Sequence, residues 1–469
     1  MADDKKGATF SLKVMINKER TKVLFADSDS HFADILLSFL SLPLGRIVKV
    51  LEKHYGDEAP TIGSLSSLYR SLVNLDSAYF WTDGAKQTLL DPTSSLEDEY
   101  RRLKLDIADF QPAEYFSCSN TQYHIPSYRF RSVGIYYDHI KRCKICSFGI
   151  FIKEVAKKGS EAAASRDGVF TMNTSSFIIS DDLHIFPNET GLLGVISFLG
   201  ITDMDNAEQI KVDLGFTEIM NLLKASLTSP TPLSDIILNK TTQLVNSKFM
   251  VTQPHTTEEE NPNNSWNLSL KVMIQQSTGK VAYAQANKQF VEFLFSFLYI
   301  PLVGVEHLLA GNTCVKAIDN LYRSTSDLAD SKHFITPDTK KRLMTPILPH
   351  GYISAHCIFP LAEECLPAEY NDYLNLLSSV KFPNGQGSYL KGSPTYHVAD
   401  DLTVTPFCFA STLSSLKEQK ISISDVKEVE MQIGLKEALS ILKASLTSST
   451  ALTDALMIRK SLKQPKREV

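Results

Sequence analysis

Three cysteines and a histidine in the first half of the chain are the residues best suited to chemistry. Cys143 and Cys146 form a C-x-x-C pair, and Cys118 and His124 lie upstream of it. Thiolate and imidazole groups at such spacings are common ligands of a structural, tetrahedral zinc ion. A second C-x-x-C pair would need a cysteine where Thr121 stands, so His124 is the best candidate for the fourth ligand. The sequence thus predicts a site for one structural Zn²⁺ at these four side chains.

The same thiols admit other interpretations. A lone C-x-x-C pair also occurs as a redox pair, or as two incidental thiols in a metal-free loop. His139 is an alternative fourth ligand. The chain has seven cysteines in 469 residues, an odd and scattered set that does not suggest a disulfide framework. We therefore expect thiols or metal ligands in a reducing compartment.

The elements that must position these residues belong to a duplicated unit. The segment S-L-K-V-M-I occurs at 11–16 and again at 269–274, and L-K-A-S-L-T-S occurs at 223–229 and at 442–448. Two such blocks in the same order indicate an internal repeat. We predict a first unit over 8–240 and a second over 266–461. Between them, 241–265 is polar, contains two prolines and reads as a linker.

The first unit carries a segment that the second lacks. Pro92 matches Pro346, and Gly168 matches Gly387, but the span between the matched pairs is about 35 residues longer in the first unit. The extra residues form an insert at about 110–160, and it contains all four predicted zinc ligands. The second unit has no such cysteine cluster, so we expect its core to fold without metal.

Each unit is predicted to open with a β-hairpin followed by an amphipathic helix. Apolar and polar residues alternate on both sides of a polar turn, as in a half-buried hairpin. Asp29 or Ser30 can cap the first helix, which Pro43 ends, as Pro301 does in the second unit. Each unit closes with another helix, and no regular βαβ order appears, so we expect two tandem α+β domains. The helical stripes are Phe32, Ile35, Leu36, Phe39 and Leu40, then Phe216, Met220, Leu223 and Leu227, and their counterparts Phe290, Phe293, Leu294, Phe297, Leu298, Leu435, Leu439, Leu442 and Leu446.

Acidic pairs recur in both units, at Asp181-Asp182 and Asp400-Asp401. Neighbouring side chains in an extended chain point to opposite faces, so they cannot easily share one metal or one proton. We expect one residue of each pair to hold a turn or a helix start through backbone hydrogen bonds. No phosphate-binding loop, zinc-protease or nucleophile-elbow motif is present, and the sequence predicts no enzyme.

The bulk composition is that of an ordinary globular protein, with 43% hydrophobic and 22% charged residues. The formal net charge of −5 argues against binding a polyanion with the whole surface. Residues 1–10 lack the apolar core of a signal peptide, and no later apolar run is long enough to span a membrane. We expect an intracellular protein, cytoplasmic or nuclear, with no membrane association.

The motifs resemble a plant family called domain of unknown function 674. The resemblance rests on S-L-K-V-M-I, on F-x-x-x-L-L-S-F-L-S-L-P-L-G at 32–45, on D-D-L at 181–183 and on the L-K-A-S-L-T-S block. It covers both units and implies a land-plant origin and a tandem architecture. Members carry cysteine pairs near the middle of the unit, which Cys118, Cys143 and Cys146 match and Thr121 does not. The resemblance supplies no catalytic residues.

The positions shared by the two units are mostly apolar-stripe and turn positions, and no convergent polar set repeats. We therefore expect a non-enzymatic interaction or scaffold protein, which binds protein partners through the exposed edge of its hairpin or through the insert. The alternative is zinc-stabilised binding of nucleic acid or an acidic partner, because eight basic and two acidic residues lie between Arg129 and Lys158. A third class is an enzyme with an unfamiliar site between the units.

Overall fold

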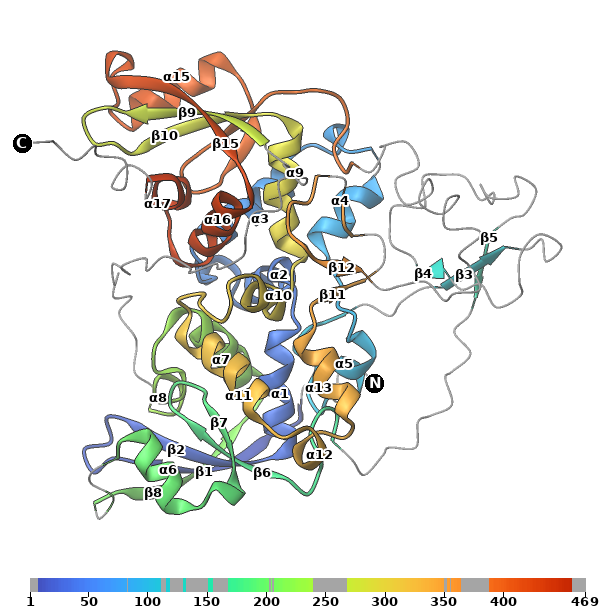
Figure 1. Ribbon diagram of the computed structural model, residues 1–469, viewed down its shortest axis with the longest axis vertical. Coiled ribbons are helices and arrows are strands. Elements are labelled where there is room, and N and C mark those ends of the chain that lie inside the picture. The colour runs from blue at the N-terminus through green and yellow to red at the C-terminus, as the bar shows by residue number, and fades with distance from the viewer. Residues whose placement is uncertain are drawn as a thin grey trace, which may run out of the picture.

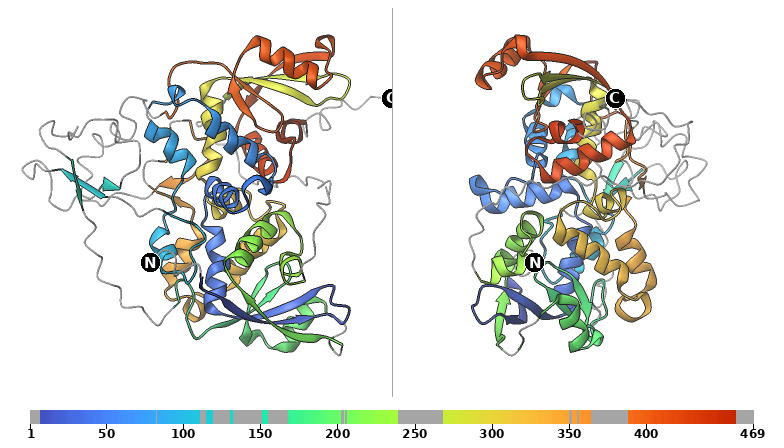
Figure 2. Two further views of the ribbon diagram at one scale, coloured as in Figure 1. Left: turned by 180° about the vertical axis from the view of Figure 1, so that it is seen from behind. Right: turned by 60° about the vertical axis from the view of Figure 1, so that its left-hand side comes forward.

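Two antiparallel sheets lie at opposite ends of the molecule, with most of the helices between them (Figures 1 and 2). The computed structural model describes residues 7–81, 83–110, 115–118, 130–131, 151–154, 168–201, 204, 206–238, 268–349, 352–354, 356–363 and 388–457. Its helices and antiparallel sheets make an α+β fold, as predicted. The boundaries predicted for the two units and the linker stay a prediction.

The first sheet, drawn at the lower end of Figure 1, is built from the first unit alone. Apolar residues alternate along its opening strand, so Phe10, Leu12, Val14 and Ile16 are buried on the face toward the helices. In the order β7-β6-β2-β1-β8, its strands are Ile185–Pro187, Ser176–Ser180, Val23–Asp29, Phe10–Ile16 and Glu208–Leu214.

The second sheet repeats this order with strands of the second unit. The predicted hairpin is present in both units as β1–β2 and β9–β10. In the order β14-β13-β10-β9-β15, the strands are Val404–Pro406, Tyr396–Val398, Val281–Ala286, Leu268–Gln275 and Val426–Ile433. The prediction of an exposed hairpin edge was wrong, because β1 pairs with β8 and β2 pairs with β6, so both outer sides of the hairpin are occupied.

The helices also follow the repeat. The predicted stripes are buried in both units, except at the start of the two closing helices, where Phe216 is half-buried and Leu435 is 44% exposed. In the second unit the last two residues of the opening stripe lie in a short 3-10 helix, Phe297–Tyr299, that follows the α-helix. In the first unit the helices are α1 Ser30–Leu40, α2 Leu44–Tyr55, α3 Leu65–Asn74, α4 Asp83–Leu90, α5 Glu97–Arg102, α6 Leu192–Leu199, α7 Phe216–Thr228 and α8 Pro232–Ile237. In the second they are α9 Lys288–Ser296, α10 Leu302–Leu308, α11 Lys316–Asp327, α12 Asp330–His333, α13 Pro337–Met344, α15 Phe409–Glu418, α16 Leu435–Thr447 and α17 Ala451–Met457.

Equivalent side chains cap equivalent helices in the two units. Asp29 and Asn287 accept the backbone N–H of the third following residue, each at 3.0 Å, which satisfies one donor that a helix start leaves unpaired. Asp181 accepts the N–H and hydroxyl of Ser234 in α8 at 2.7 and 2.8 Å. Asp400 does the same for Thr453 in α17, at the same two distances. The structural role predicted for the acidic pairs is thus confirmed.

The two units exchange a helix. α11 of the second unit packs on α1, α7 and β7 of the first, and α3 of the first packs on α9 and β14 of the second. The hydroxyl of Ser324 on α11 accepts the N–H of Ile185 in β7 at 2.9 Å, and Ser71 on α3 accepts the N–H of Val404 in β14 at the same distance. Each exchanged helix therefore covers one edge strand of the other unit's sheet.

The two units contact each other at their proline-containing turns. Pro43 and Pro301 form an isolated antiparallel bridge. The N–H of Leu44 donates to the carbonyl of Ile300 at 2.9 Å, and that of Leu302 donates to Leu42 at 3.1 Å. These reciprocal bonds give the pair of units a pseudo-twofold axis. The residues around it are almost all buried, so the helices of both units share one continuous hydrophobic core.

Within the insert, the structure describes three short strands, β3 Tyr115–Cys118, β4 Phe130–Arg131 and β5 Phe151–Glu154. They pair antiparallel in the order β4-β3-β5, and Cys118 is opposite Phe151. Two further short strands, β11 Ile347–Leu348 and β12 Ala362–Glu363, pair in parallel in the second unit.

Candidate functional site

The predicted zinc ligands fall mostly outside the described residues. Cys118 is the last residue of β3, while His124, Cys143 and Cys146 lie in stretches that the structure does not describe, as does the alternative ligand His139. Across the described ranges, no group of three or more His, Cys, Asp or Glu side chains is placed to hold a metal ion. The zinc site stays a prediction, as does nucleic-acid binding through the insert.

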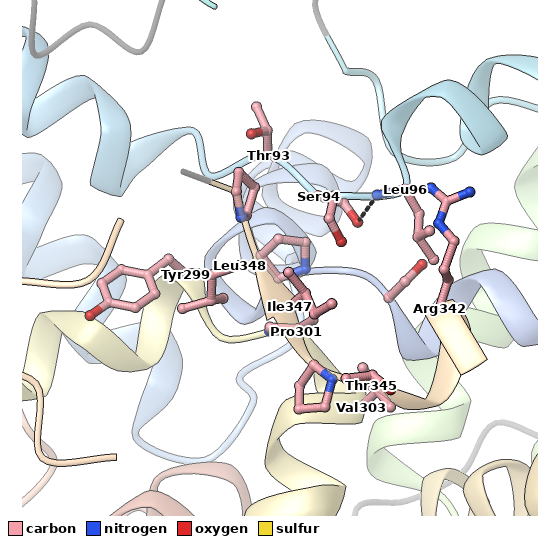
Figure 3. A pocket seen from close by; sticks show the side chains of 15 residues that line it. Thr93, Ser94, Leu96, Tyr299, Pro301, Val303, Arg342, Thr345, Ile347 and Leu348 are labelled. Atoms are coloured by element: carbon pink, nitrogen blue, oxygen red, sulfur yellow. Dashed lines mark hydrogen bonds between the residues drawn. The ribbon is translucent and has the colours of Figure 1, made fainter. Parts of the chain in front are cut away.

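A hollow at the seam between the units is the first candidate in the described structure (Figure 3). Pro43 and Pro301 are among the residues that line it, and it is partly open to solvent. One wall is polar, with Thr93, Ser94 and Ser95 from the first unit. The opposite wall is apolar, with Ile347, Leu348 and Pro349 at the equivalent positions of the second unit.

The polar groups of this hollow are engaged within the protein. The N–H of Thr93 donates to the Tyr352 hydroxyl at 3.0 Å, and the Ser94 hydroxyl accepts the N–H of Leu96 at 3.1 Å. The Arg342 guanidinium at the rim is paired with Glu99. Because these side chains already bond across and along the seam, the hollow reads as packing between the units and offers little to a ligand.

Two buried carboxyl groups at equivalent positions of the two units accept backbone N–H groups from a distant segment of the chain. Asp34 on α1 accepts the N–H groups of Val169 and Thr171 at 2.6 and 2.8 Å, and burial raises the pKa of Asp34 to about 6. At the equivalent place on α9, Glu292 accepts the N–H of Leu390 at 2.6 Å, and burial raises the pKa of Glu292 to about 7. Both side chains are at most 2% exposed, so their chemistry is structural.

A third buried carboxyl belongs to the second unit alone. Glu306 on α10 is fully buried, and its carboxyl accepts the Thr313 hydroxyl at 3.2 Å. Burial, and then the neighbouring Asp319 carboxyl, raise the pKa of Glu306 to about 9. Glu306 is therefore protonated at neutral pH. The first unit has Val48 and Ser66 at the equivalent positions, so this carboxyl pair is not a feature of the repeated fold.

The most unusual surface of the described structure is on α6, which lies on the outer face of the first sheet (Figure 1). Along β6, Phe177 and Ile179 enter the main core, while Ile178 faces the other way and packs with Phe25 and Val195. Val195 is the one buried residue of α6. Leu192, Leu193 and Phe198 are 64%, 82% and 62% exposed.

Aromatic side chains extend this apolar surface along β7. The His184 ring stacks on Phe186 with centroids 4.8 Å apart, and Phe198 contacts Phe186 at 4.8 Å and His184 at 5.1 Å. Burial lowers the pKa of His184, which keeps its ring neutral in the physiological range. We call Leu192, Leu193, Phe198, Phe186 and His184 the α6 surface.

Comparison with known proteins assigns a family. The family model described as "Protein of unknown function (DUF674)" matches residues 6–434, and a second match covers 377–469. The chain belongs to the DUF674 family. The predicted resemblance is thereby confirmed, and the two overlapping matches fit a tandem arrangement. No curated protein and no solved structure matches the chain.

The DUF674 assignment carries no function, so the site must be argued from geometry. Of the sheet edges in the described structure, β7 and β14 are covered by the exchanged helices, whereas β8 and β15 have no further strand beside them. In the same ranges, no helix is both long and apolar enough to cross a lipid bilayer. Among the described residues, α6 carries more exposed large apolar side chains than any other helix.

Sequence reasoning missed the α6 surface, although a signal was present. The segment L-L-G-V-I-S-F-L is apolar on every side, and such a helix is normally buried on every side. Its counterpart in the second unit, α15, has the sequence F-A-S-T-L-S-S-L-K-E and is mixed. An alignment of the two segments would have shown that α6 is apolar where the equivalent helix of the second unit is largely polar.

Proposed function

We propose that this DUF674 protein is a non-enzymatic interaction protein that binds the apolar face of a partner protein through the α6 surface. The observation that carries the proposal is the exposure of Leu192, Leu193 and Phe198 on one short helix. Soluble proteins seldom leave large aliphatic and aromatic side chains clustered in water, and such clusters mark interaction sites.

The rest of the described structure supports a binding role over catalysis. The buried carboxyls Asp34, Glu292 and Glu306 bond within the core, and the polar side chains of the seam bond to one another. On the outer face of the first sheet, by contrast, Phe198 is held by Phe186 and His184 and still presents more than half of its surface. Aromatic side chains that are held by neighbouring rings and are still exposed commonly act as anchors in protein interfaces.

The test uses the full chain as bait and compares three proteins. They are the wild type, a Leu193→Ser/Phe198→Ser double variant, and a Phe409→Ser control on α15, where Phe409 is 71% exposed. Proteins recovered with the wild type are identified, purified and titrated against all three baits. We expect the double variant to bind about tenfold more weakly or worse and the control to bind like the wild type. Equal affinity of the wild type and the double variant would reject the proposal.

We further propose an intracellular location, cytoplasmic or nuclear, and a plant source. Cys314 and the exposed Cys408 carry free thiols, which suits a reducing compartment. A fluorescent fusion of the full chain tests the location, and accumulation outside the cell would reject it.

A further inference from the structure

We infer that the seam between the units is a recognition site, at which the second unit accepts a first unit as its partner and excludes another second unit. This site is separate from the α6 surface and does not depend on the proposed function. Two features of the described residues support it. The contacts across the seam come in equivalent pairs, and at two places the paired positions carry side chains of very different size.

The backbone contacts across the seam repeat as they do between the subunits of a twofold dimer. An isolated antiparallel bridge joins Phe80 of the first unit to Leu390 of the second, and the equivalent bridge joins Phe334 of the second to Thr171 of the first. Such reciprocal contacts are typical of an isologous interface. Each bridge is flanked by two backbone N–H to carbonyl bonds of 2.9 to 3.1 Å, which run from Trp81 to Tyr389, Lys391 to Tyr79, Ile335 to Phe170 and Met172 to His333.

These backbone bonds do not choose between the two kinds of unit. Every residue except proline offers the same N–H and carbonyl groups, so a first and a second unit could form the same bonds with any partner of this fold. The choice of partner must therefore come from side chains, at positions where the two units differ and the seam leaves little space.

The first such position is Gly45, near the start of α2. A Cβ atom there would meet the carbonyl oxygen of Leu298, in the second unit, at 2.9 Å. The second unit has Val303 at the equivalent position, where it lines the hollow of the seam. If a second unit took the place of the first, this valine would have to fit where one added carbon is already too close. The backbone bonds beside Pro43 and Pro301 hold the two turns together, so the seam cannot easily widen there.

The second position is Gly63, just before α3. A Cβ atom there would meet the carbonyl oxygen of Ser445 on α16 at 2.5 Å, and the φ of 46° is one that residues with a side chain seldom adopt. The N–H of Ser64 donates to the same carbonyl at 2.9 Å, which fixes the close approach. The second unit has Lys316 at the equivalent position, and its ammonium group pairs with Asp182 of the first unit at 2.9 Å.

The two glycines make the pairing directional. A first unit presents Gly45 and Gly63 to the backbone of a second unit, whereas another second unit would present Val303 and Lys316 to the same backbone. Exclusion of a wrong partner by steric overlap is a common source of specificity. The partner that fits the second unit is therefore a first unit, and the covalent linkage in this chain supplies it at a high local concentration.

The experiment starts from the folded full chain, with a site for a sequence-specific protease placed in the predicted linker 241–265 and a tag on the second unit. After complete cleavage, the first unit should stay bound to the tagged second unit with a dissociation constant below about 1 μM. Gly45→Val/Gly63→Lys gives the first unit the residues of the second. It should raise this dissociation constant at least about a hundredfold, because both side chains would meet backbone of the second unit.

Two control variants should leave the dissociation constant nearly unchanged. Gly56→Ala also places a side chain at a positive φ, 58°, but a Cβ there has no neighbour within 4 Å. Lys316→Ala removes only an exposed ion pair. Circular dichroism of the uncut chains checks that each variant folds. If the double variant does not fold, Gly45→Ala adds one carbon at the same contact and should weaken the pairing at least about tenfold.

Release of the first unit from the cleaved wild type at micromolar concentration would overturn the inference, because the seam would then depend on the peptide link. Equal affinity of the wild type and the glycine variants would also overturn it, because the space at these glycines would then select nothing. Neither result bears on the proposed function, since capture of a partner by the uncut chain depends on α6, where neither glycine lies.

Discussion

The outer helices α6 and α15 occupy the same place in the two units and differ in almost every exposed side chain. Both end in a left-handed residue, Gly200 and Lys420, with matching hydrogen bonds that close the last turn. Aligned on that turn, exposed Phe198 stands where the second unit has Glu418, and Ser197 where it has Lys417. The sheets beneath keep the same strand order. The repeat thus fixes the scaffold, and the proposed binding surface lies where its two copies differ.

The interior shows the same lesson on a smaller scale. Arg46 is buried in the first unit, where it pairs with Asp91 at 2.8 Å and lies 4.6 Å from the Phe110 ring. The second unit has Gly304 at that place, packed so closely that a Cβ would meet Ile300 at 2.8 Å. Arg46 and Gly304 therefore occupy equivalent positions with very different side chains, while the backbone around Pro43 and Pro301 stays paired.

The largest effect should come from breaking the exchange of helices. Leu321→Ala removes a fully buried side chain of α11, and we expect a loss of about 3 kcal/mol in the free energy of unfolding. Because α11 packs on the first unit, hydrogen exchange should speed up in β6 and β7 as well as in the second sheet.

The matched control for this experiment is Leu68→Ala, at the equivalent position of α3. It should produce the mirror-image result, with β13 and β14 affected together with the first unit. If each variant increased hydrogen exchange only in the unit that contains it, the two units would unfold independently. The exchanged helices would then not couple the stability of one unit to that of the other.

The second prediction concerns the carboxyl that only the second unit has. The pKa of Glu306 is raised from 4.5 to about 9, so the folded state keeps this proton while the unfolded chain loses it. The stability associated with the protonated form is complete below about pH 4.5 and is lost as the pH rises toward 9. Glu306→Gln, a neutral mimic, should raise the free energy of unfolding at pH 8 and change it little at pH 4.5, so that its advantage over the wild type grows across this range.

Asp34→Asn and Glu292→Gln, the matched neutral mimics of the two other buried carboxyls, should show the same gain over narrower ranges of pH than Glu306→Gln. Since the pKa values of Asp34 and Glu292 are raised to about 6 and about 7, their pH-dependent gains should level off near those values. Chemical denaturation at a series of pH values measures all three. A gain for Glu306→Gln that also levels off near pH 7 would show that its carboxyl is less perturbed than the geometry indicates.

The sequence predicted the local elements well and the exchange not at all. The alternation at Leu12, Val14 and Ile16 predicts a strand, and the stripe through Phe32 and Phe39 predicts a helix, because the period of apolar residues is a local property of the sequence. The segment L-Y-R-S occurs at 68–71 and again at 321–324, ending in Ser71 and Ser324. Nothing in it says that each hydroxyl accepts a backbone N–H from the other unit, because two similar sheets offer the same apolar surface to either helix.

The candidate site divides in the same way. The zinc prediction rests mostly on the types and spacings of residues that the structure does not describe, so it stays a prediction from the sequence. The α6 surface depends on which side of a helix meets a sheet, and only the structure shows that Val195 is the one residue of α6 that becomes buried. An apolar segment without a polar side reads in a sequence as core, and its exposure is a property of the assembled fold.

The smallest expected effect on stability is the most informative about function. Phe198→Glu gives α6 the residue that α15 has at the same place, and its side chain is 62% exposed. We expect the free energy of unfolding to change by less than about 1 kcal/mol, since the loss is limited to contacts with Phe186 and His184. Val195→Ala, which removes the buried contact to the sheet, should cost more in the same thermal unfolding experiment. A large destabilisation by Phe198→Glu would instead mean that Phe198 serves the fold, because a surface kept for a partner should be nearly neutral for the protein that carries it.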